Sequence, residues 1–456
     1  MTRPVITALL ALCLASGGCH HPYEEAATRI AEAARQDDGA WTKLATLTDT
    51  IGARMAGSPA LDRAAAWAKA AFLADGQENV RLEPVRVPHW VRGAESAAIV
   101  APVARPLSLL ALGGSVGTPP EGITAEVVAV PSFEALAALG PKVAGKIVLY
   151  THAMPATGHP GKNYGAAIPF RTQGAARAAA QGALAVLVRS LTASLGVPHT
   201  GRVMYPEDSP RRIPAAAVTV EDAALLERLA ARGPVTVQIY LGASTLPDVD
   251  AANVVAGLRG RERPDEIVLI GAHLDSWDVG QGAQDDGAGV AIVMQALATL
   301  RRLGLQPRRT IRAVLFTDEE LRGSGGKQYA VTHADELPRH VAAFETDTGP
   351  GAPLGFMTDG PQPWLGEARK AARALAPLGA KAVIPGFPGE DVLKLKPAGV
   401  PLLGLMVDMS HYFDVHHSVA DTLEKVDPQN LQRNVAALAT MAFIVADQPQ
   451  VWRSKP

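Results

Sequence analysis

Residues 266–289 read EIVLIGAHLDSWDVGQGAQDDGAG and join an unbroken apolar run to a glycine-rich turn. The run over residues 266–272 is short and continuous, which predicts a strand buried on both faces, as in a parallel sheet. His273 and Asp275 follow its carboxyl end, the edge at which open α/β sheets bind ligands. The turn leads into a helix expected from about residue 290 to 303. This stretch therefore predicts a strand, turn and helix of an α/β fold.

Three more strand-like runs each precede side chains that can bind a metal. Residues 310–316 precede Glu319 and Glu320, residues 340–345 precede Asp347, and residues 400–407 precede a pair of histidines. We expect these ends to meet at one edge of the sheet. A two-zinc centre needs nitrogen and oxygen ligands from several elements. The candidate metal ligands are His273, Asp285, Glu320, Asp347 and His417.

The turn and the two glutamates favour particular roles. Glycines let the backbone approach a metal cluster closely, and a carboxylate at a helix start is favoured by the helix dipole, so Asp285 is the expected bridging ligand. The alternative is an ordinary Asp cap. We assign Glu320 to zinc and Glu319 to general base and acid; alone, such a pair is more often a solvated helix start. Asp275 lies two residues beyond His273 and is expected to accept the second N–H of that imidazole.

The ordered set resembles the co-catalytic zinc aminopeptidase and glutamate carboxypeptidase family of metallopeptidases. The motifs that carry the resemblance are His273-Leu274-Asp275, Asp285-Asp286-Gly287, Glu319-Glu320, Asp347, and His417 with Asp421-Thr422. The resemblance implies an α/β fold, the zinc-peptidase three-layer α/β/α sandwich with an inserted protease-associated-like domain. It implies two Zn²⁺ ions per chain, one held by His273 and Asp347 and the other by Glu320 and His417, with Asp285 bridging.

The same resemblance bears on three neighbouring residues. It implies a cis peptide bond between Asp285 and Asp286. It favours His417 over His416, which is left with a pocket or structural role. Asp318 departs from the family pattern, where alanine is common, and its charge is expected to raise the pKa of Glu319.

The expected function is that of an exported di-zinc metallopeptidase that hydrolyses dipeptides or short peptides, with carboxypeptidase or dipeptidase specificity. The alternatives are an aminopeptidase of the same family, a zinc amidohydrolase or cyclase, and a non-catalytic binding protein on this fold. The expected partners are a small peptide substrate and a second copy in a homodimer. The formal net charge of −2 gives no basic footprint for nucleic acid.

Four segments are expected along the chain. Residues 1–19 form a signal peptide of lipoprotein type, residues 20–118 the N-terminal part of the catalytic domain, residues 119–245 the inserted domain, and residues 246–456 the rest of the catalytic domain. Strand-like runs at 127–130, 146–150 and 183–188 indicate the insert. We interpret the insert as a lid, with passive scaffold as the alternative. Its Arg171 and Arg202 are candidate partners of a substrate carboxylate or members of surface salt bridges.

The N-terminal residues predict export. Arg3 precedes an apolar run over residues 5–15 that is too short to span a bilayer, and small residues precede Cys19. Cys19 is then the lipidated first residue, which gives the only expected membrane contact; simple cleavage and secretion is the alternative. The protein is expected in the periplasm, on the outer membrane as a lipoprotein, or outside the cell. Cys13 lies inside the signal, so no internal disulfide is expected after cleavage.

Overall fold

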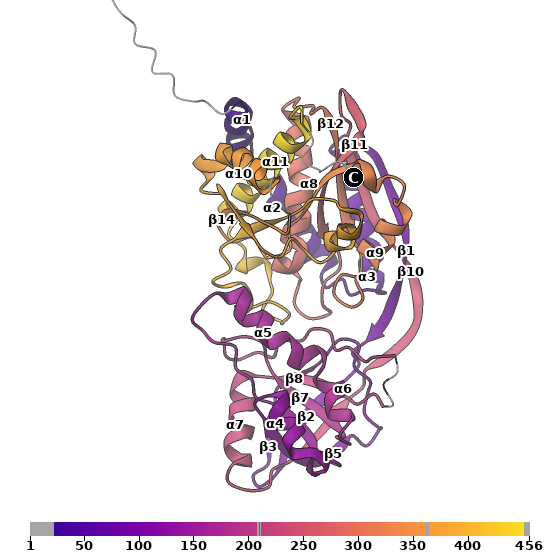
Figure 1. Cartoon of the computed structure of the whole chain (residues 1–456). Helices are drawn as coiled ribbons and strands as arrows, with labels where there is room; N and C mark the ends of the chain where they lie inside the picture. The colour runs from indigo at the N-terminus through magenta and orange to yellow at the C-terminus, as the bar shows by residue number, and fades with distance from the viewer. Residues whose placement is uncertain (1–21, 208, 210, 361–363, 451–456) are drawn as a thin grey trace, which may run out of the picture.

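The protein has two regions, each built around its own β-sheet (Figure 1). The computed structural model describes residues 22–207, 209, 211–360 and 364–450. The predicted signal peptide and Cys19 lie outside the described residues. Within those residues, no helix has both the length and the apolar composition that crossing a bilayer requires.

The first sheet has eight strands in the order β1-β10-β12-β11-β13-β16-β14-β15. Its central strands β12, β11, β13 and β16 are parallel, so their carboxyl ends lie at one edge. The four strands predicted from the apolar runs are these four. The strands are β1 (Glu78–Val91), β10 (Ser244–Leu258), β11 (Arg263–His273), β12 (Arg309–Phe316), β13 (His340–Glu345), β14 (Pro353–Thr358), β15 (Ala382–Pro385) and β16 (Leu402–Val407).

Helices cover both faces of this sheet, because its central strands are apolar on both sides. On β11, Val268 and Ile270 belong to the core beneath one helical layer, and Leu269 belongs to the core beneath the other. The predicted three-layer α/β/α sandwich is therefore confirmed. One layer contains α1 (Glu24–Arg35), α2 (Gly39–Ala45), η1 (Thr46–Ile51), α3 (Pro59–Ala74), α8 (Ala288–Arg302), α10 (Trp364–Ala372), η5 (Arg373–Leu378) and α11 (Pro428–Asp447); the other contains α9 (Ser324–Thr332), η4 (Leu337–Arg339) and η6 (Val392–Ala398).

The second sheet has eight strands in the order β3-β2-β9-β5-β6-β7-β8-β4. Separate apolar cores lie on its two faces. The strands are β2 (Glu95–Ala101), β3 (Arg105–Leu107), β4 (Leu109–Ala111), β5 (Ile123–Val130), β6 (Ile147–Tyr150), β7 (Ala185–Arg189), β8 (Ala215–Val218) and β9 (Thr236–Leu241); the helices are α4 (Phe133–Leu139), η2 (Gly140–Val143), α5 (Pro160–Thr172), α6 (Gly174–Ala179) and α7 (Val220–Ala230).

This second region begins earlier in the chain than the boundary expected at residue 119. Strands β2 and β4 pair with β9 and β8, so residues 95–111 belong to the second sheet rather than to the catalytic sheet. The long antiparallel pair β1 and β10 joins the two regions, as Figure 1 shows along one side of the molecule. The insert therefore occupies the chain between the end of β1 and the start of β10. Its expected likeness to a protease-associated domain stays a prediction.

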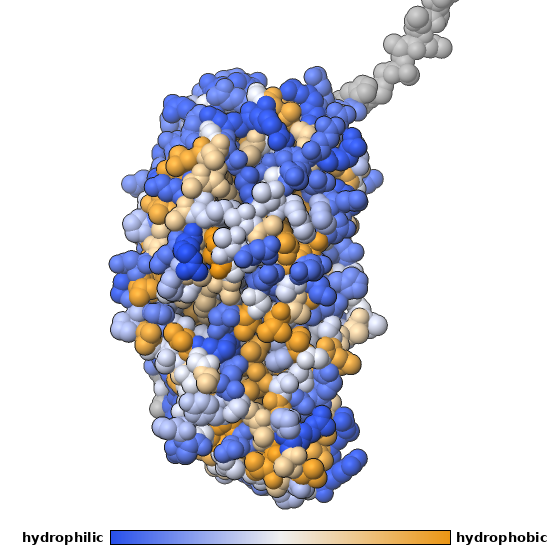
Figure 2. All heavy atoms as spheres, turned by 180° about the vertical axis from the view of Figure 1, so that it is seen from behind, coloured by the Kyte–Doolittle hydropathy of each residue, from blue (hydrophilic) through white to orange (hydrophobic). Residues whose placement is uncertain are grey.

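The surface differs between the two regions. In the view from behind, Figure 2 shows apolar side chains gathered more densely over the lower half, which is the insert, than over the catalytic half. Val100 and Val103 beside the β2–β3 turn are among the exposed apolar residues of the insert, the latter 69% exposed. On this face the insert therefore has the more apolar surface.

Candidate metal centre

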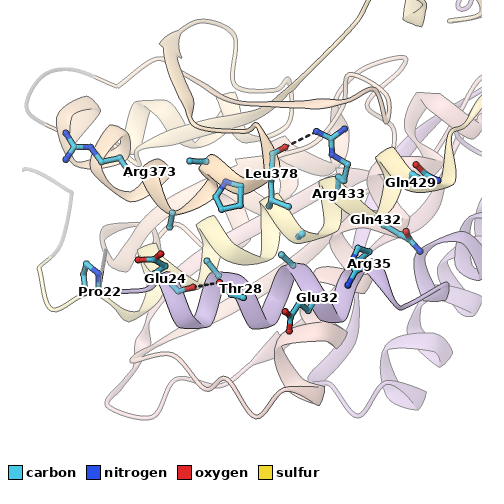
Figure 3. Close-up of a pocket in the computed structure, with 16 residues that line it drawn as sticks. Pro22, Glu24, Thr28, Glu32, Arg35, Arg373, Leu378, Gln429, Gln432 and Arg433 are labelled. Atoms are coloured by element: carbon cyan, nitrogen blue, oxygen red, sulfur yellow. Dashed lines mark hydrogen bonds between the residues drawn. The ribbon is translucent and has the colours of Figure 1, made fainter. Parts of the chain in front are cut away.

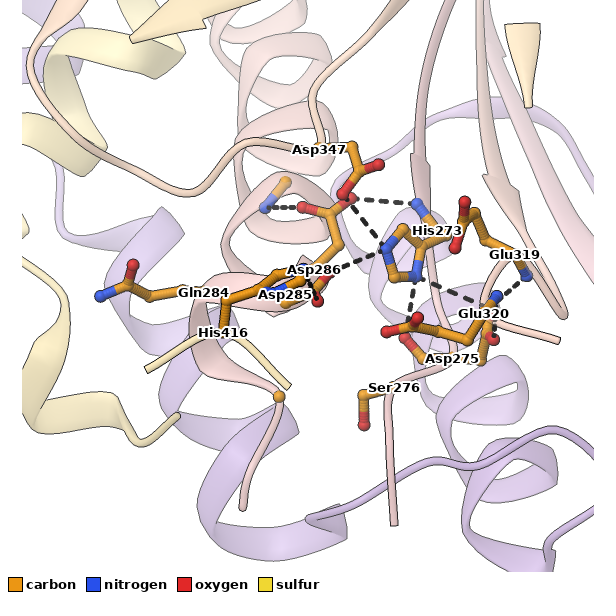
Figure 4. Close-up of polar contacts among 12 residues, drawn as sticks. His273, Asp275, Ser276, Gln284, Asp285, Asp286, Glu319, Glu320, Asp347 and His416 are labelled. Carbon is orange, nitrogen blue, oxygen red and sulfur yellow. Dashed lines mark hydrogen bonds and ion pairs between the residues drawn. The ribbon is translucent and has the colours of Figure 1, made fainter. Parts of the chain in front are cut away.

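The carboxyl ends of the parallel strands bring the five candidate ligands together. His273 is the last residue of β11, and Asp285 lies in η3 (Ala283–Gly287), the turn that begins α8. Glu320 follows β12, Asp347 follows β13, and His417 follows the short turn η7 (Tyr412–Asp414) beyond β16. Figure 4 shows His273 with the carboxylates of Asp285, Glu320 and Asp347 around it.

Asp285 lies between two groups of side chains. Its Oδ1 is 3.1 Å from Nε2 of His273, and that nitrogen is also 3.3 Å from Oδ1 of Asp347. Its Oδ2 is 3.1 Å from Nε2 of His417, which is 3.2 Å from Oε2 of Glu320. Each oxygen of the Asp285 carboxylate is therefore 3.1 Å from a different histidine, and each of these histidines also faces a second carboxylate. This arrangement is what a bridging ligand requires.

These separations suit zinc. Two ligand atoms that each lie about 2.0–2.2 Å from a tetrahedral ion are about 3.3 Å apart. Oδ2 of Asp285 and Oε1 of Glu320 are buried, and neither accepts a well-formed hydrogen bond from a described residue. A buried carboxylate oxygen that accepts no well-formed hydrogen bond is costly, and a divalent cation would remove that cost. The residues present therefore fit the metal ions that the sequence predicts.

The charges point the same way. Burial opposes protonation of His273 and His417, yet the facing carboxylates outweigh it and hold the pKa of both imidazoles well above the ordinary value. Burial raises the pKa of Glu319 well above its usual range, and the charges of Glu320 and Asp347 raise it further, whereas His273 and Arg202 oppose the shift. The cluster thus concentrates negative charge in a buried space, which favours cation binding.

Asp318 is not among the largest causes of the raised pKa of Glu319. Its carboxylate is buried and accepts a hydrogen bond from the hydroxyl of Ser324 at the start of α9. Burial and the charge of Asp275 raise the pKa of Asp318 itself. The largest causes of the raised pKa of Glu319 are burial and the charges of Glu320 and Asp347, and the expected effect of Asp318 stays a prediction.

The loop that carries Asp285 is fixed by a buried arginine and an aspartate. Arg54 is fully buried and donates to the carbonyls of Leu274, Gln281 and Gly282 at 2.8, 2.8 and 3.0 Å. Asp421 accepts the backbone N–H groups of Gln284 and Asp285 at 2.7 and 3.2 Å. The peptide bond between Asp285 and Asp286 is cis, which confirms the prediction. Arg54 was not predicted from the sequence, because a lone arginine outside any motif carries no recognisable pattern.

Asp286 supports the same turn from the opposite side. Its Oδ2 accepts the backbone N–H of His273 at 3.0 Å, and its Oδ1 accepts the N–H of Gly289 at 3.1 Å. A Cβ at residue 289 would lie 2.1 Å from Oδ1 of Asp286. Only glycine therefore allows the start of α8 to approach this carboxylate so closely.

Asp275 lies where predicted, beside His273. Its carboxylate Oδ1 is 3.6 Å from Nδ1 of His273 and helps to raise the pKa of that imidazole, while its backbone carbonyl lies 3.0 Å from the same nitrogen. The role of the carboxylate as acceptor of the imidazole N–H stays a prediction. Because a carbonyl can only accept, it still places the proton on Nδ1. The carboxylate accepts the backbone N–H groups of Glu319 and Glu320 at 3.1 and 3.3 Å.

Both histidines of the His416-His417 pair approach Asp285. The rings are stacked with centroids 3.6 Å apart, and Nε2 of His416 is 3.3 Å from Oδ2 of Asp285. Of the two histidines, His417 is the one whose Nε2 also faces Glu320 within the described part of the chain. The rings of Tyr164 and Tyr412 pack around His416. The geometry favours His417 as the ligand and His416 as a wall of the site.

A separate cavity lies away from these side chains. It has a volume of about 1050 Å³ and lies between α1, η5 and α11 (Figure 3). Arg35, Arg373 and Arg433 line it together with alanines and glutamines. The groups of described residues able to hold a metal ion all include Asp285 instead. The cavity therefore does not mark the candidate catalytic centre.

The sandwich and the carboxylate–histidine cluster at its strand ends define a metallohydrolase of the zinc-peptidase class. Residues 253–442 match peptidase family M28. Carboxypeptidase Q from Homo sapiens is 40% identical over 429 residues, which cover 94% of this chain and 89% of that protein; carboxypeptidase Q from Bos taurus is 42% identical over 409 residues, covering 89% and 85%. The chain belongs to peptidase family M28 and is a zinc-dependent metallopeptidase.

Solved structures agree with this assignment. A peptidase M28 precursor from Shewanella amazonensis SB2B superimposes with a TM-score of 0.91 at 37% identity, covering 95% of this chain and 98% of that one. An aminopeptidase from Aneurinibacillus sp. strain AM-1 has a TM-score of 0.66 at 21% identity, with 93% and 97% covered, and shares the fold. The resemblance inferred from the motifs is therefore confirmed.

Proposed function

We propose that the chain holds two zinc ions, one through His273 and Asp347 and the other through Glu320 and His417, with Asp285 bridging. The observation that carries this proposal is the placement of the two Asp285 oxygens, each 3.1 Å from a different histidine. When bound, such ions supply positive charge that makes water acidic near neutral pH and polarises a carbonyl group.

Glu319 is the proposed general base and acid. Its backbone is held by Asp275, while its half-buried carboxylate makes no hydrogen bond or ion pair to a described residue and stays available to a water or substrate. Its raised pKa, due first to burial and then to Glu320 and Asp347, suits a group that takes a proton from water and returns it to the leaving amine. Glu319→Gln should keep zinc, measured by elemental analysis, and lose most peptidase turnover. Near-normal turnover with zinc bound would contradict this role.

The proposed substrates are dipeptides or short peptides with a free terminal carboxylate. One support is the similarity to carboxypeptidase Q over most of both chains. The other is that Arg171 and Arg202, two arginines of the insert, differ in their hydrogen bonding. Arg171 is engaged, since it donates to Tyr164 and Thr200. Arg202 is half-buried, makes no hydrogen bond or ion pair within the described part of the chain, and lies near enough to Glu319 to oppose the rise in its pKa. Its guanidinium is therefore free to bind a substrate carboxylate.

Dipeptides blocked at either end test this specificity. The proposal expects cleavage of amino-blocked dipeptides and little cleavage of carboxyl-amidated ones. Arg202→Gln should reduce the difference in cleavage rate between the two kinds of substrate. Arg322→Gln, the control, removes an arginine paired with Asp248 at 2.7 Å and should leave that difference unchanged. The opposite preference, for a free amino group, would identify an aminopeptidase.

Export is proposed from the N-terminal residues alone. Fractionation of cells that express the natural chain, with Cys19→Ser as the matched variant, tests it. Membrane association that disappears in the variant supports a lipid on Cys19. Retention of both proteins in the cytoplasm would contradict export.

A further inference from the structure

The inserted region contacts the candidate metal centre at His417. The Nε2 of this imidazole faces Asp285 and Glu320, while its Nδ1 faces Thr200 and Arg171, which both belong to the insert. Nδ1 lies 3.4 Å from the backbone oxygen of Thr200 and 3.3 Å from Nη1 of Arg171. The insert therefore contacts the edge of the ring opposite the metal-facing nitrogen.

Thr200 meets residue 417 at two points. Its backbone N–H donates to the backbone oxygen of His417 at 2.8 Å, and its carbonyl faces the ring nitrogen. Thr200 is buried, and its hydroxyl donates to the carbonyl of Ala111 at 2.7 Å. An imidazole that offers Nε2 to a metal carries its proton on Nδ1, and this proton needs an acceptor. A guanidinium can only donate, so Nη1 of Arg171 cannot accept this proton. Of the two groups beside Nδ1, the carbonyl of Thr200 is therefore the acceptor.

Arg171 holds the Thr200 carbonyl from the other side. Its Nη1 lies 3.3 Å from this oxygen and donates to the hydroxyl of Tyr164 at 2.7 Å. Arg171 is buried, which excludes the surface salt bridge considered from the sequence. Gly201 leaves the room that the guanidinium needs, because a Cβ there would lie 2.3 Å from Nη1. The contact with His417 is therefore built by two segments of the insert, the end of α5 with Arg171 and the loop with Thr200 and Gly201.

The rest of the loop before His417 is also docked on the insert. Ser194 donates its hydroxyl hydrogen to the carboxylate of Asp414 at 2.7 Å. The ring of Tyr164 stacks on Phe413 with centroids 4.4 Å apart. Together with Thr200, these contacts hold the loop against the insert at Phe413, Asp414 and His417. A freely swinging lid would break all of them.

We propose that the insert helps to build the metal centre. The carbonyl of Thr200 orients the imidazole of His417, and Arg171 is a positioning residue that holds this carbonyl in place. The inference rests on the proposed role of His417 as a ligand. Because coupled sites stabilise each other reciprocally, docking of the insert strengthens binding of the ion next to His417, and that ion strengthens docking.

Zinc titration of the full chain against a competing chelator tests the proposal. Arg171→Gln should weaken one of the two ions about 10- to 100-fold, the range found when residues behind a metal ligand are changed. The ion held by His273 and Asp347 should keep its affinity. Arg171→Lys should recover part of the loss. The matched control is Arg177→Gln on α6, whose guanidinium lies over Phe133 and contacts Gln173.

Two further measurements distinguish positioning from general damage to the fold. Nitrogen NMR of labelled histidines in the zinc-loaded protein should show that one Nδ1–H signal shifts in Arg171→Gln and not in the control. Thermal unfolding of the zinc-free proteins should show a similar midpoint for all variants. Should Arg171→Gln fail to fold, Gly201→Ala displaces the guanidinium while keeping the charge and should weaken the same ion.

The possible failures are separable. Equal affinities of wild type and Arg171→Gln for both ions, or equal weakening of both ions, would overturn the positioning role. Retention of both ions at wild-type affinity in His417→Ala would instead overturn the proposed ligand assignment.

Discussion

Replacement of Asp275 by asparagine tests how Glu319, the proposed general base, is held in place. The buried carboxylate accepts the N–H groups of both Glu319 and Glu320. An asparagine has a single acceptor oxygen, so its NH₂ must face one of the two donors. Losing one charge-assisted hydrogen bond costs about 1.5–3 kcal/mol. If that cost falls on the transition state, kcat/KM drops about 10- to 150-fold, since 1.36 kcal/mol is tenfold.

The assay is steady-state hydrolysis of a dipeptide at neutral pH, with zinc content measured on the same samples. Asp275→Asn should keep the ion next to His273, because the contact to that ring comes from the backbone carbonyl of residue 275. Asp265→Asn, at the exposed start of β11, the strand that precedes Asp275, is the matched control and should behave like wild type. Activity of Asp275→Asn within twofold of wild type would refute the reasoning, and so would selective loss of the ion at His273.

Three further outcomes are expected. Gly289→Ala should lower the free energy of unfolding by about 1–3 kcal/mol, because the new Cβ meets Asp286, whereas Gly366→Ala on α10 meets no atom within 4 Å and should be neutral or stabilising in the same calorimetric assay. Burial opposes ionisation of Glu83, but hydrogen bonds from His333 and Arg81 outweigh this effect and lower the pKa of its carboxyl group. The stability advantage of wild type over Glu83→Gln should therefore be full above about pH 4.5 and shrink as the pH falls further. An advantage that does not change with pH in urea unfolding would contradict this. Chelation of zinc should lower the thermal midpoint and its return should restore it, and an unchanged midpoint would argue against metal bound to the folded state.

The catalytic sheet could be predicted because its signals are local. Each apolar run is followed within a few positions by a polar residue that can bind a metal. The strand, its direction and its candidate ligand could therefore be predicted from one short segment, as at His273 and Asp347. The order of the motifs then gave the family. The site geometry adds that Asp285 offers its two oxygens to different histidines, which no spacing in the sequence contains.

Long-range pairing explains most of what the sequence analysis missed. Residues 95–111 were placed in the catalytic region, because their partners β8 and β9 lie more than a hundred positions away. The helix α5 was not predicted, although it begins at Pro160, a residue that is well suited to the first position of a helix. The contact of Thr200 with His417 uses backbone atoms, and such atoms leave no mark in the residue type.

Zinc-edge anomalous diffraction from crystals of the zinc-loaded protein tests the bridging role of Asp285 most directly. Two peaks are expected, one beside His273 and Asp347 and the other beside Glu320 and His417, with the Asp285 carboxylate between them. A single peak, a carboxylate of Asp285 bound to one ion only, or a second ion held by His416 in place of His417 would contradict it.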